Sequence, residues 1–219
     1  MNEISHEAVD RGGMPSVLRR FSRHRVATER CELCNAALAQ LHPHLLKPEK
    51  RRIVCACEAC TLLFCGRPGA SYLRIPRRIQ LLSNLQMSPM QWDALMVPIN
   101  LAFFYRDSTA DRTIAMYPSP AGATESLLSL ESWEEIRTQD PVLQTMEADV
   151  EALLVNRVSA NPEYFLAPID ECFRLVGILR MNWKGLSGGT EVWGHIQGFF
   201  NDLRLRSSQP ATRGEVMHA

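Results

Sequence analysis

The sequence lacks the features of several protein classes. Its longest apolar stretch, residues 95–105, contains Pro98 and Asn100 and is shorter than the roughly 18 residues that a membrane-spanning helix needs. The first 30 residues contain no apolar segment of a secretory signal peptide, so we expect a cytoplasmic protein. With 46% hydrophobic and 22% charged residues and no internal repeat, the 219-residue chain is neither collagen-like, mucin-like nor wholly disordered.

An excess of charge of one sign is also absent, because 24 Lys and Arg balance 24 Asp and Glu. The charges are nevertheless unevenly placed: residues 1–80 hold 14 basic and 7 acidic residues, and residues 81–219 hold 10 basic and 17 acidic ones. This asymmetry indicates two units, which either attract each other or leave the basic one free to dock on an acidic protein surface. No aromatic stacking pattern accompanies the arginines, so nucleic acid is a disfavoured partner.

Disulfide bonds are disfavoured although the chain has seven cysteines. Six of them lie between residues 31 and 65, and such clustering in a reducing cytoplasm favours metal ligation. Two C-x2-C pairs, separated by 22 residues, stand out. Each tight turn of this kind can point two thiolates at one ion, and two turns complete a tetrahedral four-sulfur site. We predict that one metal ion, zinc or as the alternative iron, is held by Cys31, Cys34, Cys57 and Cys60.

Further side chains near these pairs leave alternatives open. Cys55 and Cys65 are both expected to be spectators, but Cys55, two residues before Cys57, is the alternate ligand. His42 and His44 could also ligate a metal. With four cysteines available, we interpret both histidines as surface donors or as groups that orient the ligands.

The pattern along the chain predicts an α+β protein made of four segments. These are a basic flexible arm at 1–28, a four-cysteine metal ribbon at 29–68, an α+β domain at 69–206 and a loose tail at 207–219. In the zinc-ribbon-like module, Ile53-Val54 and Leu62-Leu63-Phe64 are interpreted as the two strands that flank the second cysteine pair. The larger domain is expected to contain antiparallel hairpins followed by C-terminal helices.

Start signals and periodicity place the elements of the larger domain. Capping boxes predict helices that begin at Ser88 and at Ser132. Residues 118–122, with two prolines and a glycine, are expected to form a loop. Apolar stripes predict two final helices, from Pro168 and from about Thr190. Alternating apolar residues predict a strand at 99–105, and further strands are expected at 113–117, where a hairpin forms, and at 150–158 and 164–167.

No motif of a known reaction is found in the larger domain, so whether the protein is an enzyme stays open, with a non-catalytic role favoured. The segments 117–126 and 185–189 contain glycines and lead towards helix starts, where free backbone N–H groups can receive an anion. Either they are unrelated capping loops, or they converge into an interaction surface. Under the enzyme alternative, the pocket would lie at the 185–189 loop. The candidate surface residues are Ser119, Thr124, Ser187, Gly188 and Thr190.

A family resemblance rests on stretches that span most of the chain. They include Cys31–Cys34, Arg51–Cys60, Tyr117–Ser126, Val150–Arg157 and Gly185–Gly189. These stretches resemble an uncharacterised bacterial family encoded beside genes for actinobacterial-type nickel–iron uptake hydrogenases. Its pattern includes Cys55 together with the four predicted ligands, but not His42 or Cys65.

The resemblance implies a function through protein partners. It implies a non-catalytic cytoplasmic accessory protein that assists assembly or maturation of a nickel–iron hydrogenase. The partner would be a hydrogenase subunit or a maturation factor. The alternative is a rubredoxin-like iron protein or a metal-delivery protein of the same pathway. Because a family does not by itself specify chemistry, both remain expectations here.

Overall fold

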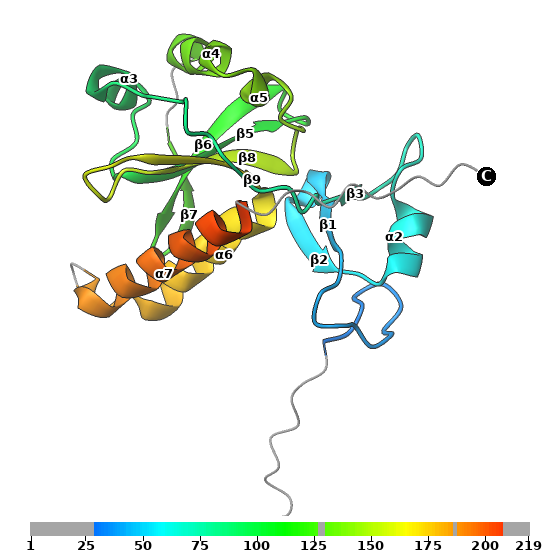
Figure 1. Ribbon diagram of the computed structural model, residues 1–219. Coiled ribbons are helices and arrows are strands. Elements are labelled where there is room, and N and C mark those ends of the chain that lie inside the picture. The colour runs from blue at the N-terminus through cyan, green and yellow to red at the C-terminus, as the bar shows by residue number, and fades with distance from the viewer. Residues whose placement is uncertain (1–28, 127–129, 186–187, 208–219) are drawn as a thin grey trace, which may run out of the picture.

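The computed structural model describes residues 29–126, 130–185 and 188–207, and its fold is α+β, as predicted (Figure 1). The predicted arm at 1–28, residues 208–219 of the predicted tail and the candidate surface residue Ser187 lie outside the described residues. In the part of the chain that the structure describes, no helix is long and apolar enough to cross a membrane.

The chain first forms a small antiparallel sheet with a short helix beside it. The strand order is β2-β1-β3. Arg51 closes the β1–β2 connection in the left-handed region, with φ 46°, and this connection fixes a register in which His44 lies opposite Cys55. The elements are β1 (His44–Lys47), the 3-10 helix η1 (Pro48–Lys50), β2 (Arg52–Cys55), α2 (Glu58–Phe64) and β3 (Leu73–Arg74).

Residues 62–64 lie in helix α2, so the prediction of a ribbon strand there was wrong. Cys57 is the N-cap of this helix, and its sulfur accepts a hydrogen bond from the backbone N–H of Cys60 at 3.4 Å. The second cysteine pair therefore begins a helix instead of ending a hairpin. A short apolar run such as Leu62-Leu63-Phe64 has no periodicity that separates a strand from a single helical turn.

A six-stranded antiparallel sheet forms the centre of the larger domain, in the order β4-β9-β8-β5-β6-β7. Its strands are β4 (Gln80–Leu81), β5 (Leu101–Asp107), β6 (Arg112–Ser119), β7 (Gly122–Glu125), β8 (Glu151–Asn156) and β9 (Glu163–Pro168). Helices lie on both sides of the sheet (Figure 1). One side has α6 (Ile169–Asn182) and α7 (Gly189–Ser207), and the other has α3 (Pro89–Ala94), α4 (Leu130–Gln139) and α5 (Pro141–Gln144).

The inner strands are apolar on both faces because each face meets a layer of helices. In β5, the ring of Phe103 lies edge-on to Phe173 of α6, with the centroids 5.7 Å apart. The next residue, Phe104, stacks on Trp133 of α4 with the centroids 5.2 Å apart. Successive side chains of a strand point to opposite faces, so both helical layers draw their core from the same strands.

Two predicted elements of the larger domain differ in detail, while the capping box at Ser88 is confirmed. Helix α4 begins at Leu130, so Ser132 lies inside it and not at its start. The predicted loop at 118–122 is a tight hairpin, because β6 continues to Ser119 and pairs with β7. Pro118 is tolerated there because the pairing of β6 with β5 ends at Met116, before a missing N–H would matter.

The small sheet lies between two hydrophobic cores. Leu45 is paired with Val54, and both pack into a small core that includes two of the ligand cysteines. The adjacent pair, Leu46 and Ile53, faces the opposite way, into the core shared with α6 and α7. One layer of three strands therefore carries the cysteine cluster on one face and packs against the larger domain with the other.

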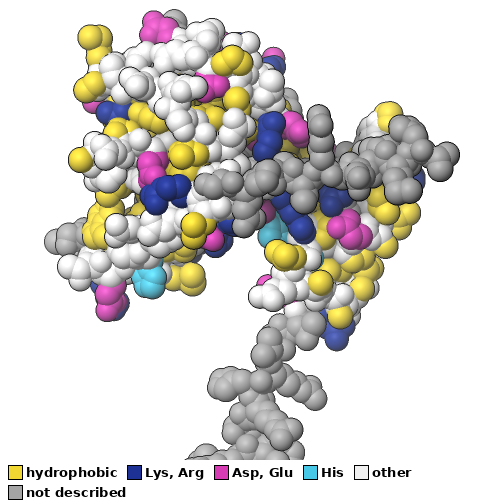
Figure 2. All heavy atoms as spheres, viewed as in Figure 1, with side chains coloured by type: hydrophobic (Ala, Val, Ile, Leu, Met, Phe, Trp, Pro, Cys, Tyr) yellow, Lys and Arg dark blue, Asp and Glu magenta, His cyan; other side chains and the backbone are white. Residues whose placement is uncertain are grey.

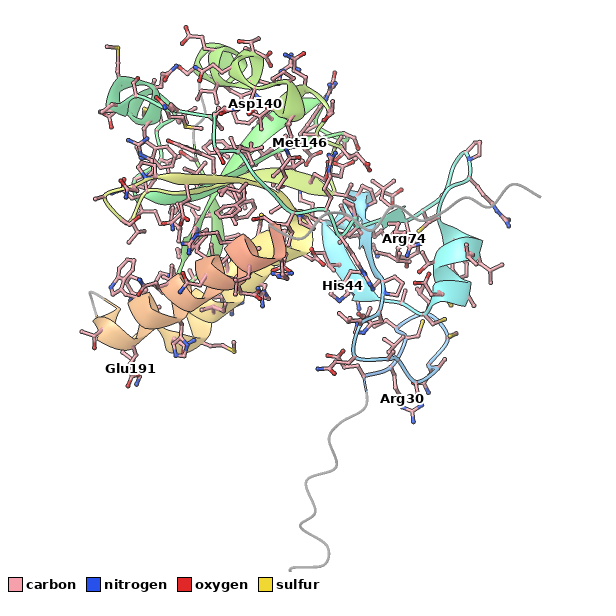
Figure 3. The ribbon with its side chains drawn as sticks, viewed as in Figure 1. Arg30, His44, Arg74, Asp140, Met146 and Glu191 are labelled. Carbon is pink, nitrogen blue, oxygen red and sulfur yellow. The ribbon has the colours of Figure 1, made fainter. Side chains whose placement is uncertain are left out.

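Polar contacts also join the small sheet to the larger domain. Nδ1 of His44 lies 2.6 Å from Oδ2 of Asp170, at the start of α6. Figure 3 shows His44 at the junction between the small sheet and the two C-terminal helices. Nε of Arg51 donates to Oδ2 of Asp107, at the end of β5, at 3.0 Å. The two contacts attach opposite ends of β1 and its turn to different elements of the larger domain.

Candidate metal centre

Two tight turns bring the four predicted ligand cysteines together. In the first turn, the N–H of Cys31 donates to the carbonyl of Ala36 and the N–H of Asn35 donates to the carbonyl of Cys31, both at 2.8 Å. Asn35 has a left-handed backbone with φ 63°, which asparagine adopts more readily than most residues. The second turn is the start of α2, where Cys57 and Cys60 lie one helical turn apart.

The four sulfurs have the spacing of a tetrahedral metal site. All four ligand atoms lie within 4.8 Å of one another, and the sulfurs of Cys34 and Cys57 are 3.7 Å apart. A tetrahedron with metal–sulfur bonds of about 2.3 Å has sulfur–sulfur edges of about 3.8 Å. The four cysteines can therefore hold one metal ion, and a four-thiolate set suits zinc and iron alike.

The electrostatics of the cluster favour a thiolate at one position. Cys31 and Cys60 are buried, whereas Cys34 is exposed. Burial acts to raise the pKa of Cys31, but hydrogen bonds from the backbone N–H groups of Cys57 and Leu33 outweigh it and lower the pKa to about 6. At Cys60, burial and the neighbouring sulfurs of Cys34 and Cys57 raise the pKa. A bound cation would stabilise the thiolate form of such a buried cysteine.

Cys55 does not join the four cysteines, and the structure groups it with His42 and His44. One ligand atom of each of these three residues lies within 4.8 Å of the other two. The register of β1 and β2 places Cys55 opposite His44, and His42 lies two residues before His44, just ahead of β1. The histidines therefore have a cysteine partner that their own spacing did not reveal. Cys65 belongs to neither group in the described part of the chain.

Both histidines use Nδ1 in a hydrogen bond. Nδ1 of His44 bonds the carboxylate of Asp170, and this hydrogen bond raises the pKa of His44 while partial burial opposes the shift. Nδ1 of His42 donates to the carbonyl of Ala39 at 2.9 Å, and the carboxylate of Glu29 lies 3.6 Å away. In each ring, Nε2 is therefore the nitrogen that remains available for a further contact.

The comparison with known families covers nearly all of the described chain. The profile of DUF5947, a family of unknown function, matches residues 30–207. The chain belongs to this family. No curated protein and no solved structure matches it. The DUF5947 match includes both cysteine pairs, the His42–His44–Cys55 group and every named helix and strand.

The predicted interaction surface of this DUF5947 chain is only partly assembled. Ser119 lines a mainly apolar cavity of about 390 Å³ together with Tyr117, Trp183 and Trp193. The cavity therefore brings the β6–β7 hairpin beside the residues that flank the 185–189 loop. The hydroxyl of Ser119 donates to the carbonyl of Gly122 at 2.9 Å, so it stabilises the hairpin turn.

The other candidate surface residues have different environments. The hydroxyl of Thr124 donates to Ser119 Oγ at 3.1 Å and so belongs to the same turn. Gly188 is buried with φ +84°, and a Cβ there would lie 3.0 Å from the ring of Trp183. Thr190 is exposed on the first turn of α7. Gly188 thus supports the position of Trp183 and does not present a surface of its own.

Proposed function

We propose that this DUF5947 protein is a non-catalytic, cytoplasmic metal-binding accessory protein that acts by contacting another protein. The observation that carries the proposal is the pairing of two features in one small module. Four cysteines gather at a spacing that suits one metal ion, and the helix that begins at the second cysteine pair exposes an apolar face. The metal stabilises the module, and the helix provides the contact.

A structural role of the metal is supported by the small size of the core around it. Among the described residues, six are buried in that core, and Cys31 and Cys60 are two of them. Modules of this size rarely reach a stable fold by burial of apolar surface alone, and four-cysteine zinc sites supply the missing free energy. Zinc is the metal of the proposal, and iron in a rubredoxin-like or metal-delivery role is its competitor.

The exposed face of α2 supports a role in protein contact. Leu62, Leu63 and Phe64 are 71%, 58% and 45% exposed, and Figure 2 shows hydrophobic side chains along the outer edge of the module. The ring of Phe64 lies edge-on to Tyr72, with the centroids 6.4 Å apart, so the face continues onto the segment before β3. Contiguous exposed apolar residues of this kind commonly mark protein interaction sites.

The partner class comes from the family resemblance of the sequence. A subunit or a maturation factor of a nickel–iron hydrogenase is the partner that this resemblance implies, and we propose it on that ground. The enzyme alternative has less support: the lining of the cavity beside Trp183 consists of apolar residues with Tyr117, Ser119 and Asn100, and Ser119 is engaged in its own turn.

Metal analysis of full-length protein, purified without oxygen, tests the first half of the proposal. We expect one tightly bound zinc ion and no visible absorption band. Cys34→Ser should lose this ion, and Cys65→Ser, which lies outside the cluster, should retain it. A visible charge-transfer band with bound iron would favour the redox alternative, and an equal metal content in both variants would refute the ligand assignment.

Binding assays with purified hydrogenase subunits and maturation factors test the second half. Leu63→Glu introduces a charge into the α2 face and should abolish a measured association. Leu205→Glu, at a residue of α7 that is 72% exposed, is the matched control and should leave it intact. If both variants bind as the parent protein does, α2 is not the contact.

A further inference from the structure

The His42–His44–Cys55 group is a second cluster of metal-ligating side chains, separate from the four cysteines. Its ligand atoms lie within 4.8 Å of one another. Metal–nitrogen bonds of about 2.0–2.1 Å and metal–sulfur bonds of about 2.3 Å allow one cation to contact three donors at such separations after small side-chain rotations. The two imidazole rings are 5.1 Å apart between centroids and nearly perpendicular, at 75°. The rings are therefore not stacked on each other.

The hydrogen bonds around the histidines prepare both rings as ligands. The carbonyl of Ala39 and the carboxylate of Asp170 can only accept, so Nδ1 of each ring must carry the proton. In that tautomer, Nε2 has a free lone pair. Metal-bound histidines in proteins have this arrangement, in which the other nitrogen donates to a carbonyl or a carboxylate that fixes the ring.

Nε2 of His42 provides an independent observation that points to a ligand. The side chain of His42 is only 6% exposed, and its Nε2 is buried without a hydrogen-bond partner among the described residues. A buried polar atom that makes no hydrogen bond costs about 1–3 kcal/mol, which is why such atoms in native proteins call for a partner such as an ion. The lone pair at this position is available for a cation.

We propose that His42, His44 and Cys55 form a second metal site that binds a borderline divalent transition-metal ion such as Zn²⁺ or Co²⁺. Two imidazoles and one thiolate suit these ions and not Mg²⁺ or Ca²⁺, which prefer oxygen ligands. Three protein ligands leave one position of a tetrahedral ion for water or another donor. The site therefore exchanges its metal more readily than the four-cysteine site does.

The second site is located at the junction with the larger domain. The partner of His44, Asp170, is in the first turn of α6, and its other carboxylate oxygen accepts from the N–H of Glu171. Glu29, near His42, adds a second carboxylate beside the cluster. Two anionic groups behind the ligands favour a bound cation, and a metal held by His44 would strengthen the attachment of β1 to α6.

Counting bound metal in single variants of the full-length reduced protein tests the proposal. The protein is titrated with Co²⁺, and the bound equivalents are measured by native mass spectrometry and by the thiolate-to-cobalt charge-transfer band. We expect Cys55→Ser and His44→Gln each to bind one equivalent less than the parent protein. The matched controls Cys65→Ser and His195→Gln, which alter a half-buried cysteine and an exposed histidine outside both clusters, should bind as many as the parent.

Two further measurements separate ligation from a structural effect. Asp170→Asn should keep the second equivalent but weaken its binding by roughly 10–100-fold, because the ligand ring loses its anionic partner. Nitrogen chemical shifts of His42 and His44 should report the Nδ1–H tautomer before metal is added and a change at Nε2 afterwards. Circular dichroism checks that every variant is folded.

The result that overturns the proposal is an equal number of bound equivalents in the parent protein, Cys55→Ser and His44→Gln. This outcome is independent of the four-cysteine site, because Cys34→Ser removes a different equivalent. If Cys55→Ser does not fold, His44→Gln decides alone, because the side chain of His44 is 35% exposed and tolerates a polar replacement.

Discussion

The contact between Arg51 and Asp107 should contribute measurably to stability, and Asp107→Asn tests it. The side chain of Asp107 is 2% exposed, and its carboxylate accepts hydrogen bonds from Arg51, from the N–H of Ala110 and from Thr109. Burial acts to raise the pKa of Asp107, but these hydrogen bonds and the charge of Arg51 prevail and lower it from 3.8 to about 2.

The magnitude follows from this shift in pKa. One pKa unit corresponds to about 1.4 kcal/mol, so lowering the pKa of Asp107 from 3.8 to about 2 contributes roughly 2.5 kcal/mol to the free energy of unfolding. Because the folded pKa lies below the unfolded one, this contribution is complete above the unfolded pKa near 3.8 and is lost as the pH falls through about 2. Asparagine keeps the shape of the side chain but removes the charge at every pH.

Urea unfolding at neutral pH measures the free energy of unfolding, and carbon chemical shifts report the titration of the carboxyl group. We expect Asp107→Asn to lower the free energy of unfolding by about 2.5 kcal/mol. The control Asp111→Asn breaks the ion pair of an 81% exposed carboxylate with Arg106 and should cost less than about 0.5 kcal/mol. Equal losses in the two variants, or a pKa of Asp107 near 3.8 in the folded protein, would refute the reasoning.

The remaining predictions concern the larger domain and are tested by chemical unfolding. Gly188→Ala should lower the free energy of unfolding by at least about 1 kcal/mol, because the left-handed backbone and the ring of Trp183 oppose a Cβ, whereas Gly194→Ala, in open space on α7, should be neutral or raise it. Glu151→Ala should cost about 1–3 kcal/mol, because Glu151 is 0% exposed and its carboxylate accepts hydrogen bonds from Arg78 and from the N–H of Glu147. An equally large loss in Glu134→Ala, whose ion pair is exposed, would contradict the second expectation.

Local signals in the sequence predicted the parts of the fold that depend on local chemistry. The two cysteine pairs were found because each C-x2-C turn is built within four residues, and the capping box at Ser88 is likewise local. The strand at 150–158 was found from its run of apolar residues, although β8 ends at Asn156, and the helix from Pro168 was found from its long apolar period. Each of these signals is contained in one stretch of chain.

Features that depend on residues far apart in the chain could not be predicted from the sequence. Cys55 was interpreted beside Cys57, and only the register of β1 and β2 shows that it lies opposite His44. The partner of His44, Asp170, is 126 residues away in the chain. The two-residue strands β3 and β4 are too short to have a period and exist only because longer strands pair with them. The prediction of a strand at Leu62–Phe64 was wrong because a short apolar run is compatible with a single helical turn as well as with a short strand.

The small sheet has a hydrophobic core on each face, and this arrangement affects how a partner protein can bind the molecule. Movement of the sheet away from the larger domain would expose Leu46 and Ile53 to water, and movement away from the cysteine turns would expose Leu45 and Val54. Both movements therefore cost free energy of apolar burial. We therefore expect the cysteine module to keep a fixed orientation relative to the larger domain. A protein that binds α2 would therefore have a fixed orientation relative to the six-stranded sheet. Loss of the metal should increase the rate of amide hydrogen exchange in β5 and α6 as well as in the module.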